Sequence, residues 1–467
     1  MIAIIGAGPA ALAAAWRTRL RGEHEVVVFE RAPTVGGLSG SFEVAGMRVD
    51  HGSHRLHPST PPHILAALRD LLGGDLQVRT RNGRIRLLDR WIAFPLETGD
   101  LLRNMPRGFA IRAGWDALTA PLRRPRADTF AEVVRAGLGR TVLDTFYTPY
   151  ARKLWDAHPA DLAGELARRR VSAASPVDIV RRLLRTRGDA DSDPEGQTFL
   201  YPRTGFGAIA EAVADAAVEA GATLRLACGV ERLRPRSGGE GWHLELRDGT
   251  SIDAEQVWST APLPVLATMV EPPPPATVTF SAERLRHRAM ILLYLVLDQR
   301  QWTPFDAHYF PGPEVLASRV SEPRNYRDNP EDPADWTVLC AEIPCWEGDD
   351  TWLTPDDDLA DRLLAELLRC GLPEGQVIRV ESRRRRQVYP VYRPGFAEDL
   401  ANLEDWVASL GALATFGRQG LFTPDNTHHA LAMGWAAAET LAESNGSADP
   451  AAWAAAREEF RAFVVED

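Results

Sequence analysis

The sequence predicts an α/β protein that begins with a unit of strand, turn, helix and strand. Residues 2–5 form a short apolar run, which is typical of a buried parallel strand. A glycine-rich turn follows, and residues 12–20 then show the apolar spacing of a helix. A second apolar run at residues 25–29 ends at Glu30. Because parallel strands need a crossover between them, these observations together predict a parallel sheet at the start of the chain.

Length and composition restrict the class of protein. The 467 residues suffice for about three units at roughly 150 residues each, or for one α/β body with an inserted domain. The formal charge of −11 argues against binding to nucleic acid or to an anionic membrane. The four cysteines form neither a disulfide framework nor a zinc-ligand spacing, so no metal site is expected. No secretory signal and no apolar stretch of about 18 residues is found; we expect a soluble cytoplasmic protein.

The first turn has the sequence G-A-G-P-A-A, which is G-x-G-x-x-A between a strand and a helix. Gly6 permits the tight turn, Gly8 lets the backbone approach a pyrophosphate, and Ala11 keeps the helix close to the strand. The amides at the helix N-terminus then face the phosphates. Glu30 lies about 22 residues after Gly8, where a carboxylate meets the ribose hydroxyls. The segment therefore predicts a dinucleotide site.

Two further segments identify the dinucleotide through a resemblance. Residues 36–41 read G-G-L-S-G-S, and residues 50–57 read D-H-G-S-H-R-L-H. Together with the first turn and Glu30, they resemble the FAD-dependent amine oxidase, protoporphyrinogen oxidase and phytoene desaturase superfamily, to which UDP-galactopyranose mutase is related. The resemblance implies that FAD is bound with its ADP half at the first turn. It also implies that residues 50–57 lie beside the isoalloxazine ring, and their G-S-H-R-L-H part is closest to the mutase pattern.

The resemblance extends to the middle and the end of the chain. Residues 201–207 resemble a family motif that leads to an adenine-contacting valine, here Val230. Residues 416–422 and 425–430 resemble the strand end and helix start that close the flavin site, where helix amides can stabilise charge on the reduced ring. The expected cofactor-binding residues are Gly6, Gly8, Pro9, Ala10, Ala11, Glu30, Arg31, Gly36, Gly37, Leu38, Ser39, His51, Gly52, Ser53, His54, Val230, Gly417, Arg418, Asn426, Thr427 and His428.

The fold that the resemblance implies is a Rossmann-like FAD-binding domain of the glutathione-reductase type, interleaved with an α+β substrate domain. The expected FAD-binding segments are residues 1–75, 198–270 and 411–467. Between them lie a mostly helical substrate-domain segment, 76–197, and a sheet segment, 271–410. Within these, alternation predicts a hairpin over about 76–95 that turns at Asn82-Gly83, and a buried strand over 288–298.

Lys153 is the only lysine of the chain. It stands in residues 147–155, which resemble a Y-x-x-K-x-W motif of protoporphyrinogen-oxidase-like and mutase-like relatives, and either an amphipathic helix with an exposed cation or a substrate-facing wall fits it. In amine oxidases proper, a lysine near the 288–298 strand holds a water at flavin N5. Its absence there counts against an amine oxidase. An apolar band between Trp91 and Trp115 is expected to pack inside rather than rest on a membrane.

Four consecutive arginines, Arg383–Arg386, precede Tyr389 and Tyr392. A solvated strand edge is one interpretation. Because alternate residues of a strand share a face, two guanidinium groups could instead reach a cleft and bind a phosphate or carboxylate. The hypothesis is a small-molecule substrate with an anionic group, and the expected substrate-binding residues are Arg384, Arg386, Tyr389 and Tyr392.

The leading functional hypothesis is a FAD-dependent oxidoreductase that transfers a hydride from a substrate carbon to flavin N5. His54 is the candidate catalytic group, with His51 and His57 as weaker ones, although a structural imidazole at position 54 fits equally well. The alternatives are a redox-neutral mutase that resembles UDP-galactopyranose mutase, and a FAD-binding protein without turnover. The sequence leaves the substrate, the electron acceptor and the oligomeric state open.

Overall fold

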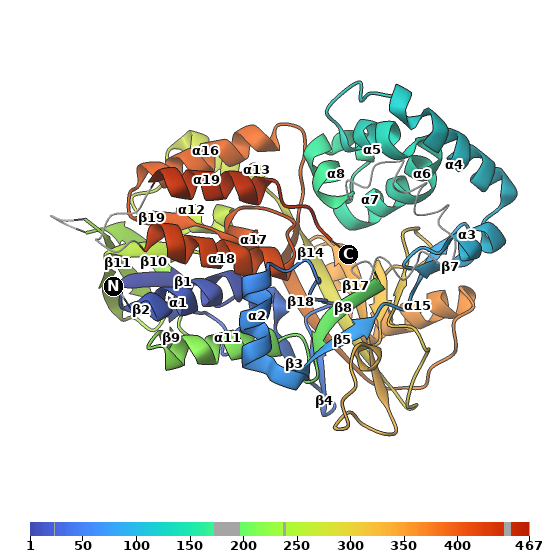
Figure 1. The fold of residues 1–467 in the computed structure, drawn as a ribbon, viewed down its shortest axis with the longest axis horizontal. Helices are drawn as coiled ribbons and strands as arrows, with labels where there is room; N and C mark the ends of the chain where they lie inside the picture. Colours follow the sequence, from blue (N-terminus) through green and yellow to red (C-terminus); the bar gives the residue numbers. More distant parts are fainter. Residues whose placement is uncertain (23, 172–196, 237–239, 443–449, 467) are drawn as a thin grey trace.

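A five-stranded parallel sheet forms the centre of one half of the molecule (Figure 1). The computed structural model describes residues 1–22, 24–171, 197–236, 240–442 and 450–466. The sheet order is β19-β13-β1-β2-β9, and every neighbouring pair is parallel. Its strands are β1 Ile2–Ile5, β2 Val26–Phe29, β9 Thr223–Arg225, β13 Gln256–Ser259 and β19 Leu413–Thr415. Every residue of β1 and β2 is buried, because helices cover one face while helices and a small sheet cover the other.

One core cluster lies on each face of this sheet. Alternate residues of β1 point to opposite sides: Ile2 and Ile4 join one cluster, Ala3 and Ile5 the other. The first cluster involves α1 Pro9–Arg21, α2 Pro62–Leu72, α11 Ala208–Glu219, α18 Thr427–Leu441 and α19 Pro450–Arg461. The second involves α12 Leu263–Met269, α13 Ala276–Arg284, α16 Phe396–Ser409 and the antiparallel sheet of β10 Val230–Pro235, β11 Trp242–Leu246 and β12 Ser251–Ala254.

A seven-stranded mixed sheet forms the other half of the molecule, in the order β18-β14-β17-β16-β15-β6-β7. Its strands are β6 Gly83–Leu87, β7 Arg90–Phe94, β14 His287–Leu297, β15 Ala307–Tyr309, β16 Arg319–Ser321, β17 Thr337–Cys345 and β18 Val377–Pro390. The predicted buried strand at 288–298 is confirmed as β14. Its odd-numbered residues pack toward α15 Asp356–Arg369, and its even-numbered ones toward the hairpin of β3 Ser41–Val44 and β4 Met47–Asp50.

A further group of helices lies at the upper right of Figure 1. It comprises α3 Thr98–Asn104, α4 Arg107–Thr119, α5 Phe130–Leu138, α6 Arg140–Val142, a π-helical turn Leu143–Tyr147, α7 Thr148–Trp155 and α8 Gly164–Arg170. Residues of α5, α7 and α8 join the second core cluster. Residues 172–196, at the end of the predicted 76–197 segment, lie outside the described residues.

The strands of the parallel sheet come from the beginning, the middle and the end of the chain, and the second sheet from the stretches between them. The predicted α/β class is therefore confirmed, with the parallel sheet interleaved with a second, α+β unit. Among the described helices, none is both long and apolar enough to cross a bilayer.

The predicted hairpin with a turn at Asn82-Gly83 is wrong. β5 Leu76–Thr80 pairs with β8 Thr198–Pro202, and the hairpin is formed by β6 and β7, which turn at Leu88 and Asp89 with φ of 50° and 59°. The amide of Asn82 donates to Asp306 Oδ2 at 3.0 Å instead. Because of this tertiary contact, Asn82 and Gly83 do not form a hairpin turn. They connect β5, which pairs with β8, to β6 of the seven-stranded sheet.

The predicted interior packing of the apolar band holds only in part. Ile92 and Met105 are buried, but Ile111 and Trp115 on α4 are 73% and 69% exposed. The helix α4 packs its other side onto the helical group and leaves these two side chains in solvent, so the prediction is wrong for them.

Candidate functional site

The first glycine turn leaves a backbone surface open at the start of α1. Gly6 has φ of 97°, and a Cβ there would lie 2.5 Å from Thr260 Oγ1, so only glycine fits. At Gly8, in contrast, a Cβ would meet no described atom within 4 Å. Gly8 is the N-cap of α1 and, within the described chain, no side chain caps the helix. The open space and the uncapped amides suit the pyrophosphate of a dinucleotide.

Glu30 lies beside this turn at the end of β2. Its carboxylate accepts hydrogen bonds from the amides of Ala7 and Ala32, both at 2.8 Å. Each carboxylate oxygen keeps a lone pair for a further donor, such as a ribose hydroxyl. The Cys228 amide donates to Glu30 O at 2.8 Å, which brings the half-buried Val230 to the same end of the sheet. Arg31 is exposed there.

The second glycine turn meets the first. The Gly36 amide donates to Ala7 O at 2.8 Å, and a Cβ on Gly37 would lie 3.5 Å from Gly8 Cα. Leu38 and Ser39 continue as a short 3-10 turn, in which Ser39 Oγ lies 3.2 Å from Thr427 Oγ1 at the start of α18. The two glycine turns and the N-terminus of α18 therefore converge, although more than 380 residues separate Ser39 from Thr427.

The segment before α18 is fixed by close packing and by a half-buried guanidinium. A Cβ on Gly417 would lie 2.9 Å from the Cβ of Ala10, so glycine is needed for this approach to α1. Arg418 is half-buried, and its Nη2 donates to Val388 O at 2.8 Å. Desolvation lowers the pKa of Arg418. Its Nε has no hydrogen-bond partner among the described residues.

At the α18 start, the predicted residues point in different directions. Thr427 faces Ser39, whereas Asn426 caps the helix and exchanges two hydrogen bonds of 2.9 Å with the backbone of Glu466. His428 lies against Glu466, with Nε2 3.2 Å from Oε2. Of these residues, Thr427 is therefore the one beside the glycine turns.

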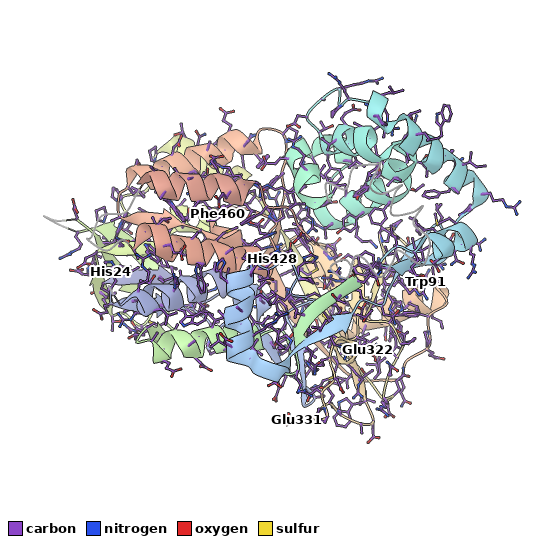
Figure 2. All side chains as sticks on the ribbon, viewed as in Figure 1. His24, Trp91, Glu322, Glu331, His428 and Phe460 are labelled. Atoms are coloured by element: carbon purple, nitrogen blue, oxygen red, sulfur yellow. The ribbon has the colours of Figure 1, made fainter. Side chains whose placement is uncertain are left out.

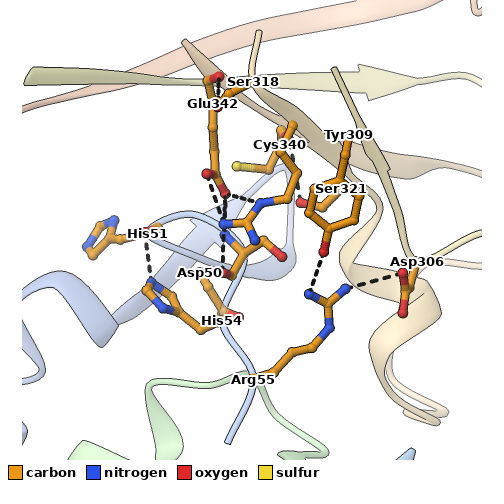
Figure 3. Close-up of polar contacts among 12 residues, drawn as sticks. Asp50, His51, His54, Arg55, Asp306, Tyr309, Ser318, Ser321, Cys340 and Glu342 are labelled. Carbon is orange, nitrogen blue, oxygen red and sulfur yellow. Dashed lines mark hydrogen bonds and ion pairs between the residues drawn. The ribbon is translucent and has the colours of Figure 1, made fainter. Parts of the chain in front are cut away.

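The glycine–histidine segment, residues 50–57, lies between the dinucleotide fold and the seven-stranded sheet (Figure 3). Asp50 holds its start, because its carboxylate accepts from Ser41 Oγ at 2.6 Å, from the Phe206 amide at 2.9 Å and from the Tyr201 hydroxyl. Gly52 has φ of 95°, which turns the chain.

Two side chains of the large sheet hold Ser53 from both sides of its backbone. Glu342 accepts the Ser53 amide at 2.8 Å, and Arg319 Nη2 donates to Ser53 O at 3.0 Å (Figure 3). The same guanidinium pairs with Glu342 at 2.7 Å. The carboxylate of Glu342 is 5% exposed, so this pair is strongly shielded from solvent.

The two histidines of the segment differ in their free atoms. His54 Nε2 lies 3.0 Å from His51 O, and its ring stacks on Phe206. Burial lowers the pKa of His54 below 6.5, which favours a neutral ring. His51 stacks on Phe42, its Nδ1 has no partner among the described residues, and burial together with Arg385 lowers its pKa to about 3. His54 thus has a structural hydrogen bond, while the uncharged His51 keeps a nitrogen free for a ligand.

The seven-stranded sheet and α8 add an aromatic and basic wall that the sequence predicts only in part. Tyr389 is half-buried beside Glu342, Arg170, Arg319 and Arg418, and desolvation raises its pKa. The guanidinium groups of Arg170 and Arg418 lie 5.3 and 5.7 Å from the Tyr389 ring centre. Tyr389 and Arg418 are among the predicted residues, whereas no local motif marks Arg170 and Arg319.

Arg55 extends this wall toward β15. Its guanidinium donates to Tyr309 Oη at 3.1 Å and pairs with Asp306 at 3.2 Å (Figure 3). It also stacks over Tyr326, 4.8 Å from the ring centre. Arg55 lies inside the G-S-H-R-L-H segment, so its position could have drawn attention to it.

The prediction that the side chains of Arg384 and Arg386 face the cleft is wrong, because these residues lie on the opposite face of β18 from their neighbours Arg383 and Arg385. Arg384 donates to Trp352 O and Thr354 O and pairs with Asp356, so it lies on the face of β18 that α15 covers. Arg386 is exposed and pairs with Glu347. The odd-numbered arginines take the other face: Arg383 lies 4.4 Å from the centre of the Phe42 ring, and the Nε of the buried Arg385 has no partner in the described chain.

Tyr392 is a core residue and not part of the wall. Its ring stacks on Phe396 with centres 3.9 Å apart, and its hydroxyl donates to Phe422 O at 2.8 Å. The predicted substrate contact of Tyr392 is therefore wrong, whereas Tyr389 lies at the wall.

Lys153 is neither an exposed cation nor part of this wall. Its Nζ donates to Phe310 O at 2.6 Å, Val315 O at 2.7 Å and Ala317 O at 3.1 Å. It thereby ties α7 to the chain between β15 and β16. Burial lowers its pKa to about 8. Both interpretations of the sequence are corrected: the lysine is a structural link.

Comparison with known proteins agrees with this geometry. The model of the flavin containing amine oxidoreductase family matches residues 11–399. A Mycobacterium tuberculosis protein that carries the name flavin-containing monoamine oxidase AofH is 32% identical over 209 residues, or 41% of this chain; the chain thus spans 44% of that relative's length.

Solved structures match over nearly the whole chain. Reduced UDP-galactopyranose mutase has a TM-score of 0.80 at 19% identity and covers 100% of this chain and 99% of its own. A protein from Exiguobacterium sp. 255-15, described as a protoporphyrinogen oxidase, has a TM-score of 0.72 at 19% identity, with 94% and 98% covered. At these identities the likeness concerns the fold. With the family match over most of its length, the chain belongs to the flavin-containing amine oxidoreductase family, whose cofactor is FAD.

Proposed function

We propose that the protein is a FAD-dependent oxidoreductase that takes a hydride from a small anionic substrate. The observation that carries the proposal is the convergence of the open Gly8 turn, the Gly37–Ser39 turn and the 50–57 segment in front of an arginine–tyrosine wall. The residues fit the cofactor, because the backbone at Gly8 is open, the start of α1 has no side-chain cap in the described chain, and the Gly37–Ser39 turn and Thr427 meet beside it. FAD supplies an electron-accepting ring, and the substrate domain supplies binding and orientation.

The residues proposed to hold the cofactor are those predicted at the glycine turns, Glu30, the 50–57 segment and Thr427. Glu342 and Arg319 keep the 50–57 backbone in place, so that His51 is presented as a neutral ring with a free nitrogen. We assign His54 a positioning role rather than acid–base chemistry, because its Nε2 is engaged with His51 O. A fixed backbone at this point holds a substrate in one orientation.

The wall supports an anionic substrate. Arg170 and Arg418 lie beside Tyr389, and guanidinium groups bind phosphate or carboxylate in a bidentate manner. Arg319 is already paired with Glu342 and bound to a backbone carbonyl, so it adds positive charge near the wall. The single lysine, enclosed by three carbonyl oxygens, is not part of the wall.

A redox-neutral mutase is the second candidate. The same wall of arginines and tyrosine suits a sugar nucleotide, and reduced UDP-galactopyranose mutase shares the fold over the full chain. Such a reaction needs FAD to be reduced beforehand and consumes no electrons.

One experiment separates these functions. The FAD-loaded protein is mixed without oxygen with carboxylated and phosphorylated small molecules, sugar nucleotides among them, and flavin absorbance is followed. An oxidoreductase bleaches the flavin with its substrate. A mutase converts a sugar nucleotide only after dithionite reduction, with no change in the flavin. Tight FAD binding with neither response would overturn both and indicate a protein without turnover.

A further inference from the structure

A cluster of imidazoles and a carboxylate lies where α18 meets the C-terminal tail, away from Thr427 and Ser39. One ligand atom from each of His428, His429 and Glu466 lies within 4.8 Å of the other two. These residues line a cavity of about 550 Å³, together with His63, Trp435 and Phe463 among others. His428 and Phe460, which are labelled in Figure 2, both line this cavity.

The hydrogen bonds of the described chain do not account for the burial of His428. It is 2% exposed, yet neither ring nitrogen makes a hydrogen bond of good geometry within the described chain. Its Nε2 lies 3.2 Å from Glu466 Oε2. This ion pair leaves Nδ1 without a partner in the described chain, and an unsatisfied buried polar atom is costly.

The donor atoms needed for coordination are present, although one of them is engaged. His429 Nδ1 accepts the Asn426 amide at a long 3.3 Å, so this nitrogen is unprotonated and a metal ion would have to take the place of that hydrogen bond. Glu466 is already oriented by the Ser59 hydroxyl and by His57, whose Nδ1 lies 3.2 Å from Oε2. Ligands held about 2.0–2.1 Å from a tetrahedral zinc ion lie roughly 3.3 Å apart, which is close to the 3.2 Å between His428 and Glu466.

From this geometry we infer that His428, His429 and Glu466 form a binding site for a divalent transition metal of the zinc type. Two imidazole nitrogens and one carboxylate oxygen supply three ligands, and the fourth position faces the cavity. Nitrogen ligands favour zinc over calcium or magnesium. The site joins the tail to the first turn of α18, and His57 and Ser59 orient its carboxylate. Sequence spacing could not reveal it, because 37 residues separate His429 from Glu466.

Zinc titration tests the inference. The FAD-loaded protein is treated with a chelator and desalted, and ZnCl2 is added in a calorimeter. We expect one zinc ion per chain, and an anomalous peak between the three side chains in zinc-soaked crystals. Glu466→Gln should weaken zinc binding at least tenfold, since loss of a mere orienting partner costs 10–100-fold.

Two further variants make the result decisive. Removal of residues 466–467 deletes the carboxylate together with the two hydrogen bonds between Glu466 and Asn426; zinc binding should fall at least as far as in Glu466→Gln, and thermal unfolding of the same protein shows whether it is still folded. His63→Ala is the matched control, because His63 lines the same cavity outside the cluster, and should bind zinc as the parent does. No zinc binding, or binding that Glu466→Gln and the truncation leave unchanged, would overturn the inference and leave a hydrogen-bonded tail.

Discussion

At Ser53, a single peptide unit is held by an ion pair from the large sheet. Glu342 accepts its amide and Arg319 donates to its carbonyl. Removing one member of a shielded ion pair leaves the other charge without compensation, which costs more than the pair itself contributes. The pair therefore matters for the position of the 50–57 segment as well as for folding.

We predict that Glu342→Ala lowers the free energy of unfolding by about 3–5 kcal/mol. The change removes the acceptor of the Ser53 amide and leaves Arg319 unpaired. Glu342→Gln keeps an acceptor and should cost less. Urea unfolding of the FAD-loaded protein gives the values, and the flavin absorption spectrum reports whether the 50–57 segment has moved.

The control for this variant is Arg386→Gln. Arg386 forms an exposed ion pair with Glu347, and such pairs contribute at most about 1 kcal/mol. Equal effects of Glu342→Ala and Arg386→Gln would show that the Ser53 clamp does not stabilise the fold.

Lys153 shows where reasoning from single residues stops. The sequence marks it as unique and places it on a helix, and α7 is a helix. Its three acceptors are main-chain carbonyls of residues 310–317. Carbonyl oxygens carry no sequence signal, so the lysine's role depends on a tertiary contact that only the structure provides.

On the element scale, β18 shows the same limit. Alternation correctly predicts that two of its four arginines share a face, because strand periodicity is local. Which pair faces the cleft depends on the elements that pack against each face of β18. Arg384 lies against α15, and Arg383 lies against the β3–β4 hairpin. A shift of one residue exchanges the two faces, and no pattern within the strand decides between them.

The two faces of β18 should respond differently to mutation. Arg385 is buried near His51 and has an unpartnered Nε, so Arg385→Met should weaken binding of FAD or of the anionic substrate by about tenfold or more, as expected for a charged hydrogen bond of about 1.5–3 kcal/mol. Arg384→Met should leave both affinities unchanged but lower stability, because it frees two carbonyls and Asp356. Fluorescence titration of FAD and substrate KM values measure the contrast. If Arg384→Met weakened binding and Arg385→Met did not, the even-numbered arginines would be the ones at the site.

The whole molecule was more predictable than its substrate side. The parallel sheet and the first glycine turn follow from local signals, since that turn stands directly after a strand, whereas the interleaved order follows from the family resemblance. The arginine–tyrosine wall combines residues from α8, β16, β18 and the short helix α17 Gly417–Gly420. Tyr389 and Arg418 are predicted at a site, but Arg170 and Arg319 are ordinary in their own segments, and the four come together only when the two halves of the fold meet.

Three enclosed histidines also make the whole molecule sensitive to acid. Burial lowers the pKa of His51 and His287 to about 3 and that of His308 to about 4, from 6.5. The unfolded chain therefore binds more protons than the folded one below pH 6.5, so stability falls as the pH drops from 6.5 toward these values. Each histidine contributes a slope of up to about 1.4 kcal/mol per pH unit.

We therefore expect the unfolding free energy of the FAD-loaded protein to decrease between pH 6.5 and pH 5, above the range in which carboxylates titrate. His287→Leu should reduce this slope by the contribution of one titrating histidine. His287 packs against Phe422, and its Nε2 has no partner in the described chain. Urea unfolding at several pH values, with FAD kept saturating because ligand binding itself stabilises, provides the slope. An unchanged slope in His287→Leu would mean that His287 accepts a proton in the folded state as readily as in the unfolded chain.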